Sequence, residues 1–474
     1  MKKISFVVIF FGILSSGTYS HAQTKADPTL LPKATGQVWT SSTPGANTAG
    51  GNYYVDPTSS MRVWRATSPT YPCASNTGES HHDYGDVTQI SREWGSGFHT
   101  LLIQTCGSYR LVDFKRGVGF SNWRTFTSGG GPSSDLHFTF SNNPATPQIA
   151  YSLNNSNLVR YNTATNQVEN TGNYPKSNWT SGPWLQNDVN DEWFVAINSS
   201  KTTATAWNSK TNQTLSATPQ PGFDEPHLTN DGRYVLLHLG DTGAIWDIQT
   251  NIVRSFSPPA GRLGHPSSPT GFITTVDVDS GGGITPHYRM DPATGQGVRI
   301  HDFGGYKPDY HHSGSWVHQS GLLTSQWFLI STYGSFNGGV LNNAVGLMRL
   351  DGSDVRFLAH TFEENGDYWQ TPRATIAVDG KLAMFDSNMR GSRGDVFVVE
   401  LPISGSTTQP PPPPPPPGGA VPGDINLDRI VNSLDWSIMS SNWLSNHPAS
   451  DVNKDGLVNS LDFSLMSSNW LRTW

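Results

Sequence analysis

Residues 161–167 read YNTATNQ, and segments of the same kind recur as WNSKTNQ at 207–213, WDIQTNI at 246–252 and MDPATGQ at 290–296. Each copy follows an apolar run and carries Thr-Asn or Thr-Gly near its end. Asn and Gly adopt positive φ more readily than other residues, so these segments predict tight turns between antiparallel strands. Looser copies begin at Leu111 and Leu350.

A second hairpin precedes these turns, as in LTNDGRYVLLHL at 228–239, where Asn-Asp-Gly separates two apolar strands. Four short strands in a unit of about 40 to 60 residues are typical of a β-propeller blade. A sandwich or a β-helix would lack this double hairpin. We therefore predict an all-β, seven-bladed β-propeller, with units near His82, His137, Asn187, His227, His265, His312 and Arg373.

The repeating unit resembles WD40-like blades of the TolB kind and the blades of secreted seven-bladed polysaccharide lyases. The segment from Ala374 to Leu401 shows the pattern best. The composition agrees with this fold class, because glycine is abundant (48 residues) and only 14% of residues are charged.

Near the C-terminus, two segments nearly repeat each other 27 positions apart. Both carry oxygen-bearing side chains at loop positions 1, 3, 5, 9 and 12, a spacing that wraps the backbone around one hard cation such as calcium. The predicted calcium ligands are Asp424, Asn426, Asp428, Asn432, Asp435, Asp451, Asn453, Asp455, Asn459 and Asp462.

Each loop leads into a helical segment, LDWSIMSSNWL or LDFSLMSSNWL. The pair resembles the type I dockerin module, whose loops end with Asp and lack an entering helix. Arg429 departs from the pattern at position 6 of the first loop, where Gly456 stands in the second. The resemblance implies a small α-helical calcium-binding module that docks onto a cohesin-bearing scaffold.

The N-terminus predicts export. Met1-Lys2-Lys3 precedes an apolar run at 4–14 and a small-residue exit at Ser20-His21-Ala22, as in a signal peptide. The run is about half of the ~20 residues that cross a bilayer, so no membrane span is expected. An unbroken proline run from Pro410 to Pro417 predicts an extended spacer. The expected organisation is a signal peptide at 1–22, a propeller at 23–403, a linker at 404–422 and the dockerin-like module at 423–474.

The net charge bears on the possible partners, and the cysteine content bears on a possible cross-link. A net charge of −7 argues against a nucleic-acid partner, which would favour a basic surface. The two cysteines, Cys73 and Cys106, form a disulfide or remain two buried thiols.

Histidines recur in five of the seven segments that precede or enter the predicted inner strands: His81/His82, His137, His227, His265 and His311/His312. Inner strands converge on the propeller axis, so these imidazoles would form a funnel able to bind a transition metal or transfer protons. The alternative is that each is structural and bonds within its own blade.

Such a funnel suits β-elimination from a uronic acid, which needs a cation or metal, a base and an acid. The predicted catalytic residues are His82, His137, His265, Tyr288 and Arg289, and a divalent transition metal is expected at His227, His311 and His312. The scheme resembles oligogalacturonate lyases, whose metal is held by histidines on a seven-bladed propeller, and ulvan lyases, although neither family's motif matches residue by residue.

We therefore expect a secreted polysaccharide lyase acting on uronic-acid-containing chains. Two alternatives stay open. One is a non-catalytic propeller that binds carbohydrate or protein. The other is a glycoside hydrolase, which would use two carboxylates among Asp83, Asp86, Asp135, Asp224 and Glu225.

Overall fold

The computed structural model describes residues 26–34, 43–404 and 423–470, apart from gaps at 77, 84–86, 220–222, 240–241, 257–271, 276–285, 303–310, 314–326, 333–340, 342, 365–367, 426–430 and 454. Contacts divide the chain into two units, residues 1–407 and 408–474. Among the described residues, no helix has the length and apolarity needed to cross a bilayer.

The described strands of the larger unit form seven antiparallel sheets, ordered β3-β4-β5, β6-β7-β8-β9, β10-β11-β12-β13, β14-β15-β16-β17, β18-β19-β20, β21-β22-β23-β24 and β1-β2-β27-β26-β25. In chain order the strands are β1 Tyr53–Val55, β2 Arg62–Arg65, β3 Phe98–Thr105, β4 Ser108–Lys115, β5 Gly119–Thr125, β6 Phe138–Phe140, β7 Ile149–Asn154, β8 Asn157–Asn162, β9 Gln167–Glu169, β10 Gln186–Asn187, β11 Trp193–Ile197, β12 Ala204–Asn208, β13 Thr214–Ala217, β14 Glu225–Leu228, β15 Tyr234–Leu239, β16 Thr242–Asp247, β17 Ile252–Phe256, β18 Phe272–Thr275, β19 Pro286–Met290, β20 Gly297–Asp302, β21 His311–Ser313, β22 Trp327–Ser331, β23 Ala344–Arg349, β24 Val355–His360, β25 Thr375–Ile376, β26 Leu382–Ser387 and β27 Asp395–Glu400.

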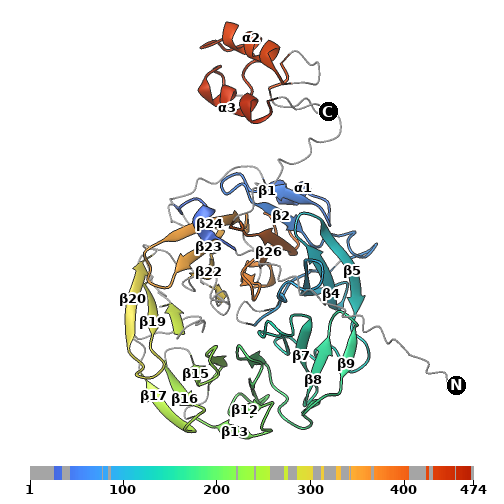
Figure 1. Cartoon of the computed structure of the whole chain (residues 1–474), viewed down its shortest axis with the longest axis vertical. Coiled ribbons are helices and arrows are strands. Elements are labelled where there is room, and N and C mark those ends of the chain that lie inside the picture. The colour runs from blue at the N-terminus through green and yellow to red at the C-terminus, as the bar shows by residue number, and fades with distance from the viewer. Residues whose placement is uncertain are drawn as a thin grey trace, which may run out of the picture. The chain divides into compact units, whose positions relative to one another are not determined.

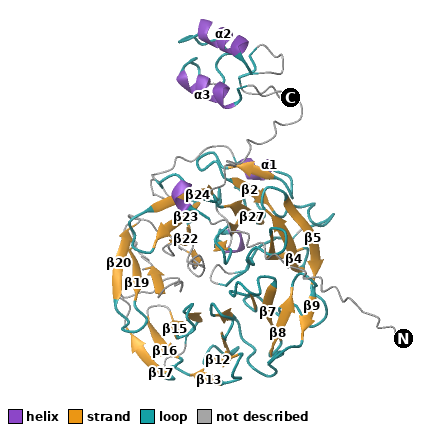
Figure 2. Ribbon diagram, in the orientation of Figure 1, coloured by secondary structure: helices purple, strands orange, loops and turns teal. Residues whose placement is uncertain are grey.

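The sheets are arranged in a ring with their last strands, such as β9, β13, β17 and β20, on the outside (Figure 1). Figure 2 shows that strands make up nearly all the regular structure of this unit. Its short helices are η1 (Pro28–Leu30), α1 (Pro44–Asn47) and η3 (Tyr368–Gln370). The predicted fold class, an all-β propeller followed by a small helical module, is confirmed.

The predicted turns are confirmed in detail. Asn166, Asn212, Asn251 and Gly295 all have positive φ, between 57° and 74°. In three copies the aromatic residue that opens the turn donates to this Asn side chain. For example, Trp207 Nε1 donates to Asn212 Oδ1 at 2.9 Å, and Tyr161 and Trp246 make the same bond in their copies. In the fourth copy methionine replaces the aromatic residue and Gly295 replaces the Asn.

The smaller unit contains two helices of equal length, α2 (Ser433–Ser441) and α3 (Ser460–Ser468). Each begins with an Asn N-cap and an Asp at the third helical position, which together form a reciprocal capping box. Val431, Met439, Val458 and Met466 are fully buried and form its core. Equivalent residues of the two repeats therefore pack against each other.

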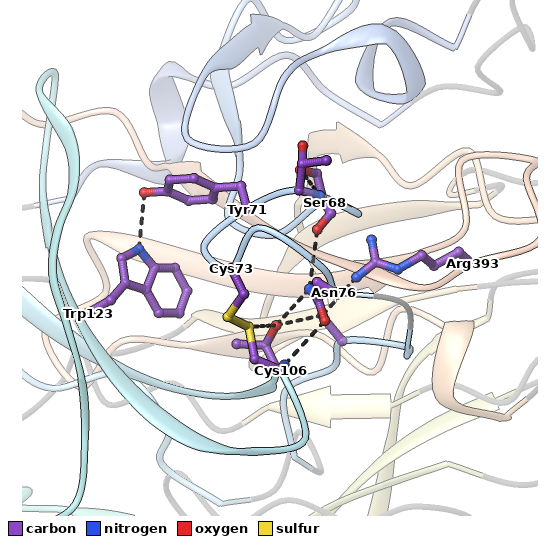
Figure 3. Close-up of a disulfide and its surroundings, with 10 residues drawn as sticks. Ser68, Tyr71, Cys73, Asn76, Cys106, Trp123 and Arg393 are labelled. Carbon is purple, nitrogen blue, oxygen red and sulfur yellow. Dashed lines mark hydrogen bonds between the residues drawn. A yellow bond between two sulfur atoms is a disulfide. The ribbon is translucent and has the colours of Figure 1, made fainter.

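A disulfide joins Cys73 to Cys106, with the two Cα atoms 6.4 Å apart (Figure 3). The sequence had left this pairing open. Beside it, the buried Asn76 side chain donates to Ser80 and Thr105 and accepts from the Cys106 backbone. The disulfide thus ties the loop that precedes β3 to the turn between β3 and β4.

Removing this cross-link should destabilise the propeller. It closes a loop with a sequence separation of 33 residues, for which chain entropy predicts a loss of about 3–4 kcal/mol on replacing both cysteines by alanine. We expect the double variant to unfold at lower urea concentration than the native protein. An unchanged midpoint under oxidising conditions would contradict this.

Candidate functional site

The inner strands β6, β10 and β14, or the residues just before them, are hydrogen-bonded to neighbouring parts of the ring. Leu136 N donates to Asp83 Oδ2 at 2.6 Å, and Leu185 N donates to Leu136 O at 2.9 Å. Gln186 Oε1 accepts from Leu228 N at 2.7 Å. β6 also lies against β10, and β10 against β14. These bonds bring side chains from successive sheets together at the inner edge of the ring.

Three of these segments share an unusual backbone conformation. Leu136, Trp184 and Arg373 each stand two residues before an inner strand, with φ of 63°, 68° and 34°. Large side chains rarely adopt positive φ, and such residues persist where the surrounding structure fixes them. The repetition shows that these positions are equivalent in three sheets.

His81 lies where three sheets meet. Its ring centroid is 4.3 Å from that of Trp369, and its Nδ1 is 2.9 Å from His82 O. Burial lowers the pKa of His81, as does the charge of Arg373, while Asp135 raises it. Residues from three parts of the chain therefore influence this one imidazole.

Asp135 also accepts a hydrogen bond from the hydroxyl of Tyr109 on β4. Burial raises the pKa of Tyr109 above its ordinary value, and the charges of Asp83 and Asp135 raise it further. Nearby, His137 Nδ1 lies 2.8 Å from Ser133 Oγ. Burial lowers the pKa of His137, against the opposing charge of Asp135.

We refer to His81, Tyr109, Asp135, His137 and Trp369 as the His81 cluster. Tyr109, Asp135 and Trp369 are half-buried and Ser133 is exposed, so the cluster borders solvent. At neutral pH it combines an imidazole that is a free base with a phenol that keeps its proton. This pairing can move protons in both directions.

His82 has a different environment. It is fully buried, with Nε2 3.3 Å from Pro372 O, and its backbone N donates to Asp386 Oδ1 at 3.1 Å. Asp386 also pairs with Arg373, whose Nη2 lies 2.8 Å from Oδ2. Burial lowers the pKa of His82 to about 3, helped by the charge of Arg373. A catalytic role for His82 stays a prediction.

His227 lies inside β14, two residues after Glu225, and His238 lies on the paired strand β15, opposite Glu225. His227 Nε2 is 3.1 Å and His238 Nδ1 is 3.6 Å from Glu225 Oε2. Two imidazoles and a carboxylate are donors that suit divalent first-row transition metals. The residues present therefore fit such an ion. His238 was not among the predicted site residues.

The other predicted residues are more widely distributed. Tyr288 is half-buried and Arg289 exposed on β19, next to the outer strand β20, rather than on an inner strand. His311 and His312 belong to β21, but their side chains, like the whole of His265, lie outside the described residues. His137 stands just before β6, whereas His227 lies within β14, so these two do not hold the same position relative to their strands.

In the smaller unit, the second predicted calcium loop is held in a turn by its own carboxylates. Asp451 accepts from the backbone N of Asp455 and Gly456 at 3.1 and 2.8 Å. Asp462, fully buried at position 12, accepts from the backbone N of Asn453 and Asn459. Gly456 has φ of 93°, as a sharp turn at position 6 requires.

The first loop uses its last carboxylate in the same way. The buried Asp435 accepts from the backbone N of Ile425 and Asn432 at 2.7 and 2.9 Å. Asn426, Asp428 and Arg429 lie outside the described residues. The described carboxylate and amide oxygens of both loops suit a hard cation.

Comparisons with known proteins found one family match and several similar structures. Residues 422–471 match the family model of the dockerin type I domain. The chain is similar in structure to an oligogalacturonate lyase in complex with manganese, with a TM-score of 0.53, 13% identity, and coverage of 75% of this chain and 99% of that one. It is equally similar to the oligogalacturonate lyase of Vibrio parahaemolyticus, with a TM-score of 0.53, 12% identity and the same coverage.

At these identities the similarity establishes the propeller fold alone. The WD40 domain of Toxoplasma gondii coronin is also similar, with a TM-score of 0.46, 11% identity, and coverage of 76% of this chain and 89% of that one. No curated protein sequence matches the chain.

The low pKa of His82 predicts acid sensitivity. Above the ordinary value of 6.5 both folded and unfolded His82 are neutral, and between 6.5 and about 3 only the unfolded chain binds the proton. Stability is therefore lost as pH falls, by about 2 kcal/mol for this residue at about pH 5. Urea unfolding at neutral and acid pH should show a smaller decrease for His82→Asn than for the native protein.

His447→Asn, at an exposed histidine of the smaller unit, is the matched control and should keep the native pH dependence. An equal decrease for His82→Asn would contradict the assignment of this proton to His82.

Proposed function

We propose that the protein is a secreted polysaccharide lyase that cleaves uronic-acid-containing chains by β-elimination. The observation that carries the proposal is the His81 cluster, in which the Tyr109 hydroxyl donates to Asp135 and His137 Nδ1 lies 2.8 Å from Ser133 Oγ. The pKa of His137 is lowered and that of Tyr109 is raised. The propeller fold shared with oligogalacturonate lyases and the dockerin type I match support the same class of protein.

In this proposal His137 is the base. β-Elimination removes the proton on the carbon next to the uronate carboxyl group, and an imidazole with a lowered pKa is free to accept it at neutral pH. Tyr109 is the acid, because its phenol carries a proton at neutral pH that it can give to the leaving glycosidic oxygen. The half-buried Trp369, whose ring is tilted against that of His81, would hold a sugar ring.

Activity should be tested on polygalacturonate, ulvan and alginate by following the ultraviolet absorbance of the unsaturated product. We expect His137→Gln and Tyr109→Phe each to lower kcat by about 10²–10⁴-fold, the usual contribution of a general acid or base. His447→Gln is the control. Product formation at the native rate by both site variants would exclude this assignment.

The same assay separates the alternatives. Binding to a uronate polymer without any product would favour the non-catalytic propeller. New reducing ends without an unsaturated product would favour the hydrolase. His265, Tyr288 and Arg289 remain predicted contributors whose substitution this assay also tests.

We further propose that the dockerin domain binds calcium and docks onto a cohesin-bearing scaffold outside the cell. Each repeat exposes a leucine and a tryptophan at equivalent positions: Leu434 and Leu461, both 59% exposed, and Trp443 and Trp470 at 38% and 40%. A matched pair of exposed apolar groups supports a protein partner.

Calcium binding should depend on the second loop. Replacing Asp451 and Asp455 together by Ala removes two anionic ligands and the acceptor of two backbone bonds, so we expect loss of one site in a calorimetric titration of the full chain. Asn446→Ala, an exposed change between the repeats, should keep the native stoichiometry. Absence of calcium uptake by the native protein would refute this proposal.

A further inference from the structure

The pairing of β14 with β15 places three potential metal ligands on one face of a sheet. Glu225 is directly opposite His238 in the antiparallel register, and His227 is opposite Leu236. Side chains two residues apart along a strand share a face, and directly paired residues share it across strands. Glu225, His227 and His238 therefore project from the same side.

This face is away from the apolar contact with the preceding sheet. Leu228, Val235 and Leu237 belong to the core shared with β11 and β12, whereas Tyr234 and Leu236 pack with Met290 on β19. The three polar residues alternate with the first set along their strands and share the face of Tyr234 and Leu236, and the His227 ring centroid also lies 6.0 Å from that of Trp184.

The three side chains are also removed from water. Their exposed fractions are 6% for Glu225, 1% for His227 and 7% for His238. One ligand atom from each lies within 4.8 Å of the others. A buried carboxylate beside two buried imidazoles is a donor set that a divalent cation can bind.

The distances also suit a coordination shell, although His227 Nε2 and Glu225 Oε2 are within hydrogen-bond distance of each other. Glu225 Oε2 is 3.1 Å from His227 Nε2 and 3.6 Å from His238 Nδ1, and the second separation is too long for a hydrogen bond. Ligand atoms in a tetrahedral shell with bonds of about 2.1 Å lie about 3.4 Å apart. Small movements of the two imidazoles would place all three around one ion.

A second group in the ring provides a contrast. One ligand atom from each of Glu93, His99 and Asp379 also lies within 4.8 Å of the others. There, however, Lys381 Nζ lies 2.7 Å from Glu93 Oε2, and Asp379 accepts from His99 and from Glu93 N. The second group is therefore an ion-pair network that includes a lysine.

We propose that Glu225, His227 and His238 bind one divalent first-row transition metal. Three protein ligands leave at least one coordination position for water or a ligand oxygen, as in catalytic rather than closed structural sites. The site does not depend on the lyase reaction proposed above, and it assigns Glu225 and His238, neither of which the sequence had suggested as a ligand.

The test uses the full chain, stripped with a chelator and then saturated with calcium to fill the C-terminal loops. Titration with Co²⁺ should give visible absorption bands typical of nitrogen and oxygen ligation, with one equivalent bound in the native protein. Bound cobalt should also raise the melting temperature, since a ligand of the folded state stabilises it. Both signals should disappear in His227→Gln and His238→Gln.

His99→Gln is the matched control, because it removes a buried carboxylate-bound imidazole from the other group and should leave the cobalt signal unchanged. Circular dichroism reports whether each variant folds. If one site variant does not fold, the other variant and the titration of the native protein still test the proposed metal site. No cobalt uptake by the native protein, or full uptake by a folded His238→Gln variant, would overturn the proposal whatever the result of the lyase assay.

Discussion

The pairing of β2 with β27 is the interaction that closes the propeller. Val63, Trp64 and Arg65, near one end of the chain, are in register with Val399, Val398 and Phe397 near the end of the same unit. Without this pairing β27 would be an open edge, and the segment that leads into β3 would no longer be held against the last sheet. Contacts between the first and last sheets, such as that of His82 with Asp386, depend on this closure.

Polar bonds reinforce the closure. Trp64 Nε1 donates to Glu400 Oε1 at 2.7 Å, and Arg65 pairs with Asp395 at 2.6 Å. On the other side of the closing sheet, Asp56 holds His360 on β24 at 2.9 Å. These partners lie more than 300 residues apart in the chain, so the loop-closure entropy is large and only the completed ring offsets it.

The sequence predicted the turns well because they are local. Asn166, Asn212 and Asn251 have positive φ, and each accepts a hydrogen bond from an aromatic residue only five positions earlier in the chain. Each turn is therefore determined within one short segment. The dockerin loops were predictable for the same reason, since each set of ligands lies within one short segment.

The candidate site was less predictable because its members meet through tertiary contacts. The rings of His81 and Trp369 are in contact although the two residues are far apart in sequence, and the bond between Tyr109 and Asp135 links β4 to the segment before β6. His238 could have been found from the hairpin around Asn230-Asp231-Gly232, because that turn fixes the register opposite Glu225.

The disulfide also carries a consequence for when the site forms. Cys73 and Cys106 bracket the loop that carries His81 and His82, and Asn76 anchors the same loop to Thr105. In a reducing cytoplasm the two thiols remain separate. A newly made chain would then hold the ring without its covalent tether, and the histidine loop would be fixed only after exposure to an oxidant. Maturation of the candidate site is in this way coupled to the oxidation of these two thiols.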